Sequence, residues 1–472
     1  CCVSKHQDIN TRAVIRAAFA NSEVTPTAGS RQQGGKREMK ISIITTKPVP
    51  SNQGNRVTFF DNLRFLFVFG VVLQHASMAY LYSSWWPVAD ESSIFVGIFT
   101  GFCDGFLMPS LFFISGYFAI PSIRKSTITQ FIHGKLRRLG IPWLVCTLFI
   151  GPILPLVYHY TRNGLILSVS YWSTWLAVMN NAVSFDFRIL PPMGQIMQND
   201  LFYQRYMWFI GLLIAFFLIF SFIYALKKSW FEPMDRPFKT VKPSILSTVK
   251  MMLTIGIITF LGSTVIIGIM FAFFPKVSDP ESWFTLGNFV QFRVSRIFLY
   301  VAYFVLGILT FKRKWIERGK FPGHNKTWLI AFAVVLFAYY FSYFLMMSAG
   351  TSEMEKLFGL LFWICLNYFT ITAFGLSVSL GVRYWNRQTS FNKTMATNSY
   401  NLYLSHYIFV IGFQLLLFTL PEIPVLLKFG LVSIPSICCG CLFSQYLIKP
   451  YPKITIALVI GLFISMVLCI HP

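Results

Sequence analysis

Charged side chains are scarce in this 472-residue chain. Only 12% of its residues are Asp, Glu, Lys or Arg, whereas 55% are hydrophobic, and the mean hydropathy is +0.60. Soluble proteins carry roughly 25% charged residues, so the composition excludes a soluble globular domain. The long apolar runs also lack the alternation of apolar and polar residues that an outer-membrane β-barrel requires. Helices are then the element that can cross a bilayer, because they satisfy their backbone hydrogen bonds internally.

Acidic residues are the scarcer charged type, with 17 against 40 basic residues and a net charge of +23. A basic excess of this size is also found in nucleic-acid-binding proteins. Here, however, Lys and Arg occur in short runs between apolar segments and in alternate loops, which is the pattern that fixes membrane topology. We therefore expect no nucleic-acid partner.

The nine cysteines match neither a disulfide framework nor a metal-binding motif. The cluster at 438–441 has no His or Asp nearby, so we expect no metal. Seven cysteines lie in apolar stretches, where a thiol behaves as a small buried residue. These seven are Cys103, Cys146, Cys365, Cys438, Cys439, Cys441 and Cys469.

Residues 1–55 lack hydrophobic periodicity and are rich in Ser, Thr, Gly and Gln, which predicts a disordered segment. They also lack the apolar core of a signal peptide. The chain opens with Cys1, and Met39 is an ordinary start, so we interpret residues 1–38 as an upstream extension. Sequencing the N-terminus of the mature protein tests this interpretation. Residues 56–472 are expected to form one membrane domain.

Long apolar segments of about 20 residues, the length that spans a bilayer, follow one another from residue 58 onward. The fold class is therefore all-α, a polytopic membrane helical bundle with 10–11 transmembrane helices, the last of which is the weakest prediction. The expected spans are 58–80, 93–119, 139–160, 205–226, 249–274, 295–311, 327–348, 357–381, 398–419, 424–447 and 453–470.

The loops between these segments alternate in charge. Basic residues dominate every second loop, and acidic residues the loops between them, which predicts a cytoplasmic N-terminus. The outside loop at 161–204 is long and contains Trp172 and Trp175. Its aromatic rings either stack on sugar rings or rest in the membrane interface as an aromatic belt. The basic loops are residues 120–138, 227–248 and 312–326.

The first span contains ionisable residues that lipid disfavours. Arg64 and His75 are eleven residues apart, so they lie on one helix face with about 16 Å between them along the axis. Such residues inside a bilayer mark a functional site by default. Arginine grips phosphate or carboxylate with two parallel hydrogen bonds, and neutral imidazole accepts a proton from a hydroxyl near pH 7. In the alternative, Asp61 and Arg64 reach the headgroups and His75 packs against a neighbouring helix.

Other polar groups in the apolar segments are candidates of lower rank. Asp104 in the second span either orients an imidazole or accepts a structural hydrogen bond. His406, in a polar stretch of the ninth span, is either a site residue or a helix-packing residue. The basic run that contains Lys135 and Arg138 either meets an anionic donor or anchors the chain at the inner face.

Five strings of this chain resemble, in order and spacing, those of the membrane acyltransferase-3 family over about residues 56–447. That family is characterised by an Arg, ten residues and then a His in its first helix, which Arg64 and His75 match. It also has an Arg-x-x-Arg pair, for which this chain offers Lys135 and Arg138; the lysine keeps the charge and loses the planar fork. The five strings are Phe60-Asp-Asn-Leu-Arg64 followed by His75, Leu111-Phe-Phe-Ile-Ser-Gly-Tyr117, Lys135-Leu-Arg-Arg-Leu-Gly-Ile-Pro142, Tyr303-Phe-Val-Leu-Gly-Ile308 and Ser399-Tyr-Asn-Leu-Tyr-Leu-Ser-His406.

The resemblance implies an O-acyltransferase of the bacterial inner membrane. The expected donor is cytosolic acyl-CoA, with acetyl or succinyl as the acyl group, and the expected acceptor is a hydroxyl of an extracytoplasmic glycan or a similar molecule. The string Phe106-Leu-Met-Pro109 further resembles the branch that modifies periplasmic glucans with succinyl groups. The alternative is a transporter or flippase for an anionic or lipid-linked substrate, although the chain lacks the repeated broken helices expected of one.

The same resemblance implies roles for the candidate residues. Arg64 and Arg138, with Lys135, would bind the anionic donor. His75 would take the proton of the acceptor hydroxyl or carry the acyl group itself. Asp104 or a neighbour would orient that imidazole, and His406 is a second intramembrane candidate.

Overall fold

The structure is a computed structural model, and the expectation for the segment 1–55 lies outside the residues that it describes. Within those residues, eleven helices are long and apolar enough to cross a membrane. This confirms the all-α polytopic fold and favours eleven spans over ten. The described residues are 58–82, 86–165, 170–183, 187–190, 205–232, 242, 244–274, 279–286 and 290–470.

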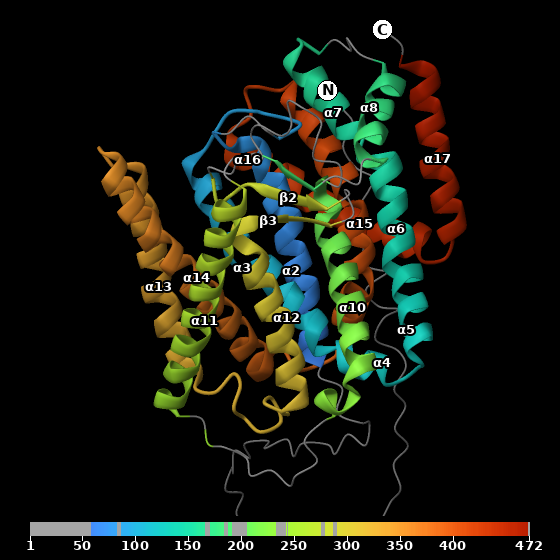
Figure 1. Ribbon diagram of the computed structural model, residues 1–472. Coiled ribbons are helices and arrows are strands. Elements are labelled where there is room, and N and C mark those ends of the chain that lie inside the picture. The colour runs from blue at the N-terminus through green and yellow to red at the C-terminus, as the bar shows by residue number, and fades with distance from the viewer. Residues whose placement is uncertain are drawn as a thin grey trace, which may run out of the picture. The chain divides into compact units, whose positions relative to one another are not determined.

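Most spans are single helices, but the third is built in pieces (Figure 1). It runs from α5 (Ile128–Lys135) through the π-helical turn η2 (Leu136–Gly140), α6 (Ile141–Val145) and a second π-helical turn, η3 (Cys146–Ile150), to α7 (Ile153–Arg162). The other spans are formed by α2 (Thr58–Ser77), α3 (Ile94–Tyr117) with α4 (Ala119–Ile123), α10 (Trp208–Leu226), α11 (Ile245–Phe273), α12 (Ile297–Lys312), α13 (Asn325–Met347), α14 (Ser352–Tyr384), α15 (Ser390–Phe418), α16 (Val425–Phe443) with η8 (Ser444–Ile448), and α17 (Pro452–Cys469).

The third span begins earlier than expected, because the helix starts at Ile128 and the segment 120–138 is mostly not a loop. The Thr127 side chain accepts a hydrogen bond from the backbone of Gln130, whose side chain accepts one from the Thr127 backbone. This capping box fixes the helix start. The expectation was wrong because it began the span only after the basic residues, at residue 139, whereas long basic side chains can extend from a helix toward water.

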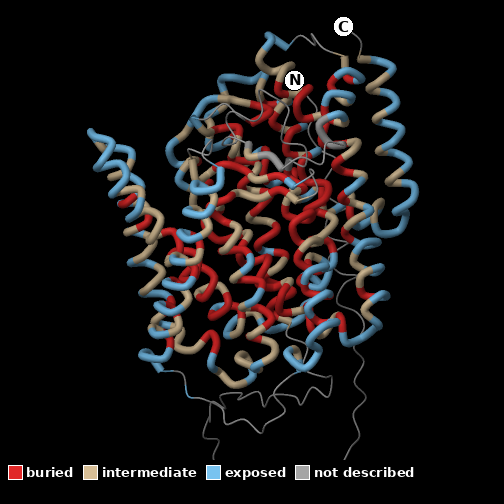
Figure 2. Tube along the Cα trace, in the orientation of Figure 1, coloured by how far each residue is buried: buried red, intermediate tan, exposed pale blue. Residues whose placement is uncertain are grey.

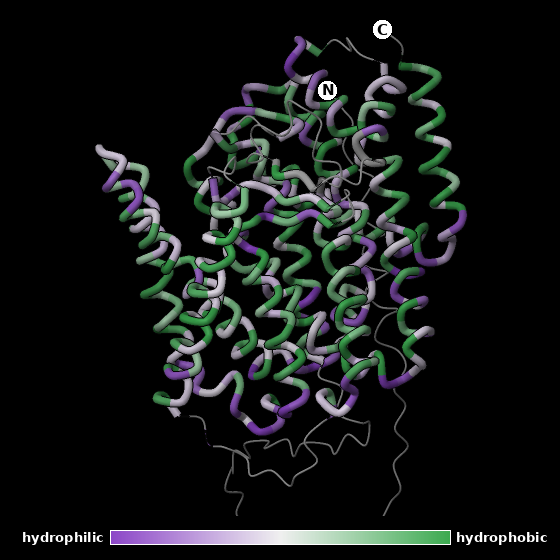
Figure 3. Tube along the Cα trace, viewed as in Figure 1, coloured by the Kyte–Doolittle hydropathy of each residue, from purple (hydrophilic) through white to green (hydrophobic). Residues whose placement is uncertain are grey.

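Helix α2 lies in the middle of the bundle, packed against α3, α14, α15 and α16 (Figure 1). Buried residues gather around it, whereas α17 has no buried side chain and is exposed along its length (Figure 2). The exposed faces are apolar, and polar residues concentrate at the two ends of the bundle (Figure 3). This distribution is what a bilayer demands of a protein whose outer surface contacts lipid.

One end of the bundle carries a small antiparallel sheet in the order β1-β2-β3, which the sequence did not predict (Figure 1). Its strands are β1 (Phe187–Leu190), β2 (Trp283–Leu286) and β3 (Val290–Arg293), and Phe284 pairs with Phe292. Strand β3 continues through the turn η7 (Val294–Arg296) into α12. We call this the sheet end, and we call the opposite end, with residues 124–127 and 313–324, the basic end.

The aromatic residues of the predicted outside loop belong to helix α8 (Tyr171–Val183). The indoles of Trp172 and Trp175 stack with their centroids 5.2 Å apart, and the Trp175 ring also lies 5.5 Å from the ring of Phe463 on α17. The Trp175 indole donates a hydrogen bond to the carbonyl of Leu148. Trp175 is thus used in packing, while Trp172 stays exposed.

The described cysteines are free thiols. Cys103 and Cys146 are buried as predicted, but Cys438 and Cys469 are exposed, because α16 and α17 turn apolar faces outward. Among the described residues, no group of three His, Cys, Asp or Glu side chains is placed to hold a metal ion.

Helices α3 and α12 touch backbone to backbone at two glycines. A Cβ atom on Gly307 would lie 2.1 Å from the carbonyl oxygen of Phe113, and one on Gly116 would lie 2.0 Å from that of Phe304. Small residues permit this close approach between membrane helices. The contact fixes the position of α12 and, through η7, that of the sheet end.

We expect Gly307→Ala to lower the stability of the protein, because the added methyl group must push α12 away from α3. Overpacking of this kind costs about 1–3 kcal/mol. Gly412 on α15 is the matched control, since its Cβ would meet nothing within 4 Å, and Gly412→Ala should be neutral or stabilising by about 0.5–1 kcal/mol. Thermal unfolding of both variants in one detergent checks the prediction. Equal unfolding temperatures would contradict it.

Candidate functional site

Two histidines from different helices form the centre of the candidate site. Nδ1 of His75, near the sheet end of α2, lies 2.8 Å from Nε2 of His406 on α15. Nδ1 of His406 lies 2.6 Å from the carbonyl oxygen of Tyr403. The structure therefore brings together two residues that the sequence proposed separately.

This chain of hydrogen bonds assigns the tautomers when both rings are neutral. A carbonyl oxygen only accepts, so Nδ1 of His406 carries a proton and donates it to Tyr403. Nε2 of His406 then accepts from Nδ1 of His75. Nε2 of His75 is left as the nitrogen that can take a proton from another molecule.

A glutamine and a tryptophan hold His75 from its other sides. The amide of Gln414 donates to the carbonyl oxygens of His75 and Ala76, at 3.2 and 3.1 Å. The Gln414 carbonyl accepts from the indole nitrogen of Trp86 at 2.8 Å. The Trp86 ring lies parallel to the imidazole of His75, with centroids 5.6 Å apart. Sequence reasoning missed both residues, although a glutamine within an apolar span was a usable signal.

The basic end of the same helix carries Arg64. Its guanidinium is 3.2 Å from the carboxylate of Asp61 and donates to the carbonyl oxygen of Ala396 on α15 at 3.3 Å. Arg138 of η2 contacts α15 one turn after Ala396. Its backbone carbonyl accepts a hydrogen bond from the Tyr400 hydroxyl at 2.8 Å. The two predicted arginines thus approach neighbouring turns of α15.

Lys135 faces a different neighbour. Its ammonium lies 4.0 Å from the ring centroid of Phe217 on α10 and 5.1 Å from that of Phe131. These are cation–π contacts, which satisfy the charge without a carboxylate. Among the three predicted donor-binding residues, Lys135 is the one whose described contacts point away from α15.

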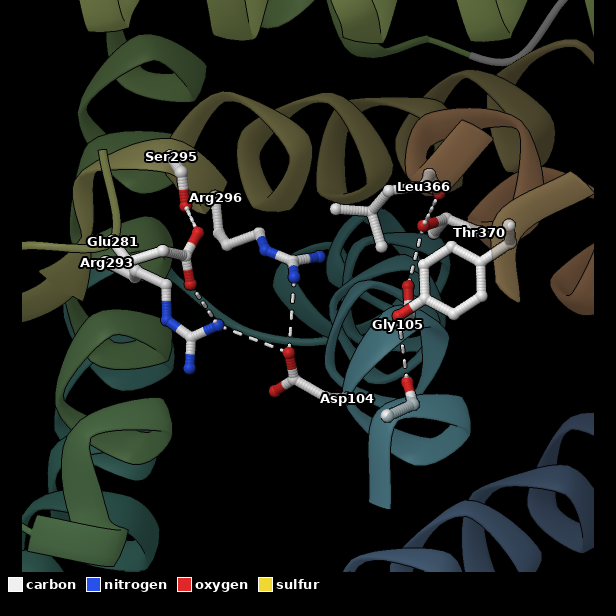
Figure 4. Close-up of polar contacts among 10 residues, drawn as sticks. Asp104, Gly105, Glu281, Arg293, Ser295, Arg296, Leu366 and Thr370 are labelled. Carbon is white, nitrogen blue, oxygen red and sulfur yellow. Dashed lines mark hydrogen bonds and ion pairs between the residues drawn. The ribbon is translucent and has the colours of Figure 1, made fainter. Parts of the chain in front are cut away.

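Asp104 binds two arginines. Its Oδ2 atom lies 3.2 Å from both Arg293 of β3 and Arg296 of η7 (Figure 4). Arg293 also pairs with Glu281 at 2.9 Å. The described contact on the imidazole of His75 comes from His406, whereas the described contacts of Asp104 are with these arginines. Sequence reasoning missed both arginines because they lie about 190 positions further along the chain.

The cluster of these four residues is electrically balanced, with two guanidinium groups facing two carboxylates. Burial lowers the pKa of Arg293, but Glu281 and then Asp104 outweigh it and hold that pKa above its ordinary value. The guanidinium therefore stays charged at every physiological pH, and the ion pairs persist with it.

The comparisons with known proteins show the family of this chain. The acyltransferase-domain model of the acyltransferase-3 family matches residues 57–470. This protein belongs to the acyltransferase-3 family. That family is defined by an acyltransferase domain, and the eleven candidate spans agree with a multi-pass membrane protein. The predicted family is confirmed.

The similar curated proteins include Glucans biosynthesis protein C of Escherichia coli K12 and of its strains DH10B and MC4100/BW2952. Each is 23% identical to this acyltransferase-3 member over 265 residues, which is 56% of this chain. The match spans 60% of the relatives' own length. No solved structure shows a significant match. The similarity supports the branch that the sequence suggested.

The pattern of an Arg, ten residues and a His falls on one helix of this family member, α2, as expected. The structure adds the partners that the pattern does not specify: His406, Gln414 and Trp86 around His75, and Ala396 beside Arg64. Helix α15 supplies three of these four residues. The pair of α2 and α15 is thus the frame of the candidate active site.

Proposed function

We propose that this acyltransferase moves an acetyl or succinyl group from cytosolic acyl-CoA to a hydroxyl of an extracytoplasmic glycan or a similar acceptor. The observation that carries the proposal is the hydrogen bond between His75 and His406, on a helix whose other end holds Arg64. An anion-binding group and a proton acceptor then share one helix, about 16 Å apart along its axis. An extended CoA arm fits that separation.

The donor half of the proposal rests on the basic end. The guanidinium of Arg64 donates to Ala396 of α15, and that of Arg138 lies 5.8 Å from the ring centroid of Tyr400, one turn further along α15. Guanidinium groups bind phosphate with paired, charge-assisted hydrogen bonds. Lys135 would add positive potential as a point charge, which is a weaker role. The excess of Lys and Arg in the loops of this end supports a cytoplasmic N-terminus in a bacterial inner membrane.

The acceptor half rests on His75. Its Nε2 atom would take the proton of the acceptor hydroxyl while the hydroxyl oxygen attacks the thioester carbonyl. The tetrahedral intermediate then expels the CoA thiolate, which receives that proton, so an ester and free CoA are formed. His406 accepts from Nδ1 of the same ring and would stabilise the imidazolium that forms in between. If His75 carries the acyl group, the same Nε2 atom attacks the thioester first.

The test is an assay of thiol release by the purified protein in nanodiscs. Acetyl-, succinyl- and long-chain acyl-CoA are offered with and without glucose oligosaccharides. We expect one donor to be consumed, and to be consumed faster when the saccharide is present. If no donor binds or is consumed with glycans supplied, the proposal fails and the transporter alternative takes its place.

We expect Arg64→Gln to raise the KM for acyl-CoA by about 10- to 100-fold, because a hydrogen bond to a charged group contributes about 1.5–3 kcal/mol. Lys326→Gln is the matched control, since Lys326 is an exposed cation at the start of α13 on the basic end. Its KM should equal that of the wild type. Steady-state kinetics with the donor consumed above measures both. An unchanged KM in Arg64→Gln would remove Arg64 from the donor site.

A further inference from the structure

Helix α2 presents polar side chains in two directions. His75 faces α15, whereas the side chain of Gln74, the preceding residue and about 100° around the helix, lies near the carboxylate of Asp104 on α3. Consecutive Cα atoms are about 3.8 Å apart. The Asp104 cluster therefore approaches α2 at the residue next to His75, about a quarter turn around the helix.

The carboxylate side chains of this cluster are partly exposed although they form ion pairs. The side chain of Asp104 keeps 38% of its surface exposed while it contacts two guanidinium groups, and that of Glu281 keeps 42%. In Figure 4, Asp104 approaches from α3, opposite Glu281, Arg293 and Arg296. Glu281 lies just before β2, and the two arginines belong to β3 and η7. A ligand can therefore reach these carboxylate side chains while their arginine partners stay in place.

Two donors at the same place lack an acceptor. Nε of Arg296 and Nε1 of Trp363 are buried and have no hydrogen-bond partner within the described part of the chain. The Arg296 side chain is only 6% exposed, and its guanidinium lies 5.8 Å from the Trp363 ring. Buried donors without partners are unfavourable, so an oxygen brought by a ligand would relieve them.

We propose that Asp104, Glu281 and Arg293, with Arg296 behind them, form a binding site for a neutral polyhydroxylated molecule such as a sugar. The inference rests on the proposed function in one respect, since it makes the bound sugar the acyl acceptor. Its hydroxyl groups would contact the carboxylates and the guanidinium group, next to the turn of α2 that carries His75.

The charge balance selects this ligand class. The two carboxylates and two guanidinium groups cancel, so an anion gains no net attraction from the cluster. An apolar ligand would remove water from four charges without replacing its hydrogen bonds. Hydroxyl groups both donate and accept, so they pair with carboxylates and guanidinium groups alike.

The test measures binding of a glucose disaccharide to the full-length protein in detergent by calorimetry, without acyl-CoA. We expect Asp104→Asn and Glu281→Gln each to weaken binding at least about tenfold, or about 1.4 kcal/mol. Glu281→Gln is the milder variant, because Glu281 lies on the exposed side of the network. Glu353→Gln, an exposed carboxylate on α14 paired with Lys356, should bind like the wild type.

Three results would overturn the site: no binding by the wild type, wild-type affinity in both cluster variants, or displacement of the sugar by inorganic phosphate. Thiol release from acyl-CoA, measured on the same preparations, separates this outcome from the proposed function. Sugar binding that depends on Asp104 without donor consumption supports the site and refutes the acyltransfer route. Donor consumption with sugar binding that is insensitive to both variants refutes the site and leaves the route intact.

Discussion

Replacing His75 by alanine is expected to abolish acyl transfer while the protein still folds and inserts. A positioned general base contributes about 10²- to 10⁴-fold to a rate, and kcat should fall by that factor. His406 cannot take over, because its Nδ1 is bound to the Tyr403 carbonyl and its Nε2 faces the lost ring. Thiol release by wild type and variant in nanodiscs, with donor and glycan present, measures the loss.

The control for this prediction is His159→Ala. His159 lies on α7, and its described ring contact is with the neighbouring Tyr158. Its replacement should leave transfer unchanged. His406→Ala should give an intermediate loss, since it removes the acceptor that fixes the tautomer of His75 and leaves Nε2 of His75 in place. Wild-type transfer by His75→Ala would exclude His75 as base and as acyl carrier.

The helical fold was predictable because the bilayer imposes a simple rule on the sequence. A span needs about 20 apolar residues, and ten of the eleven expected segments start within about eight residues of the observed helix start. The third span deviates more, since Lys135, Arg137 and Arg138 lie within it. These charges lower the hydropathy of the segment, so hydropathy alone does not predict a membrane helix there. The capping box at Thr127 nevertheless starts the helix at Ile128.

The candidate site was predictable only in part. Arg64 and His75 are on one helix, so their spacing sets their relation, and His406 was recognisable as an imidazole inside an apolar span. That His406 hydrogen-bonds His75 depends on how α15 packs against α2, and no local pattern encodes that packing. The partners of Asp104 were hidden for the same reason, because β3 and η7 reach α3 from a distant part of the chain.

Replacing Lys428 by methionine is expected to destabilise the protein by about 3–5 kcal/mol, which is the cost of removing one partner of a buried ion pair. The Lys428 side chain is 0% exposed and that of Asp90 is 9% exposed. The ammonium lies 3.0 and 2.8 Å from the two carboxylate oxygens. Without it, Asp90 is a buried charge with its main partner gone. Thermal and denaturant unfolding in a fixed detergent measures the loss.

Lys356→Met is the matched control, because Lys356 and Glu353 form an ion pair with side chains 71% and 82% exposed. Exposed pairs contribute about 0–1 kcal/mol, so this variant should unfold nearly like the wild type. Adding Asp90→Asn to Lys428→Met should recover most of the stability, since no unpaired charge is then buried. Equal losses in the two single variants would contradict the prediction.

The backbone N–H of Asp90 also donates a hydrogen bond to the carbonyl of Ala79, just beyond α2. Asp90 comes four residues after Trp86, whose ring covers His75. The destabilised variant should therefore lose activity at temperatures below its unfolding transition.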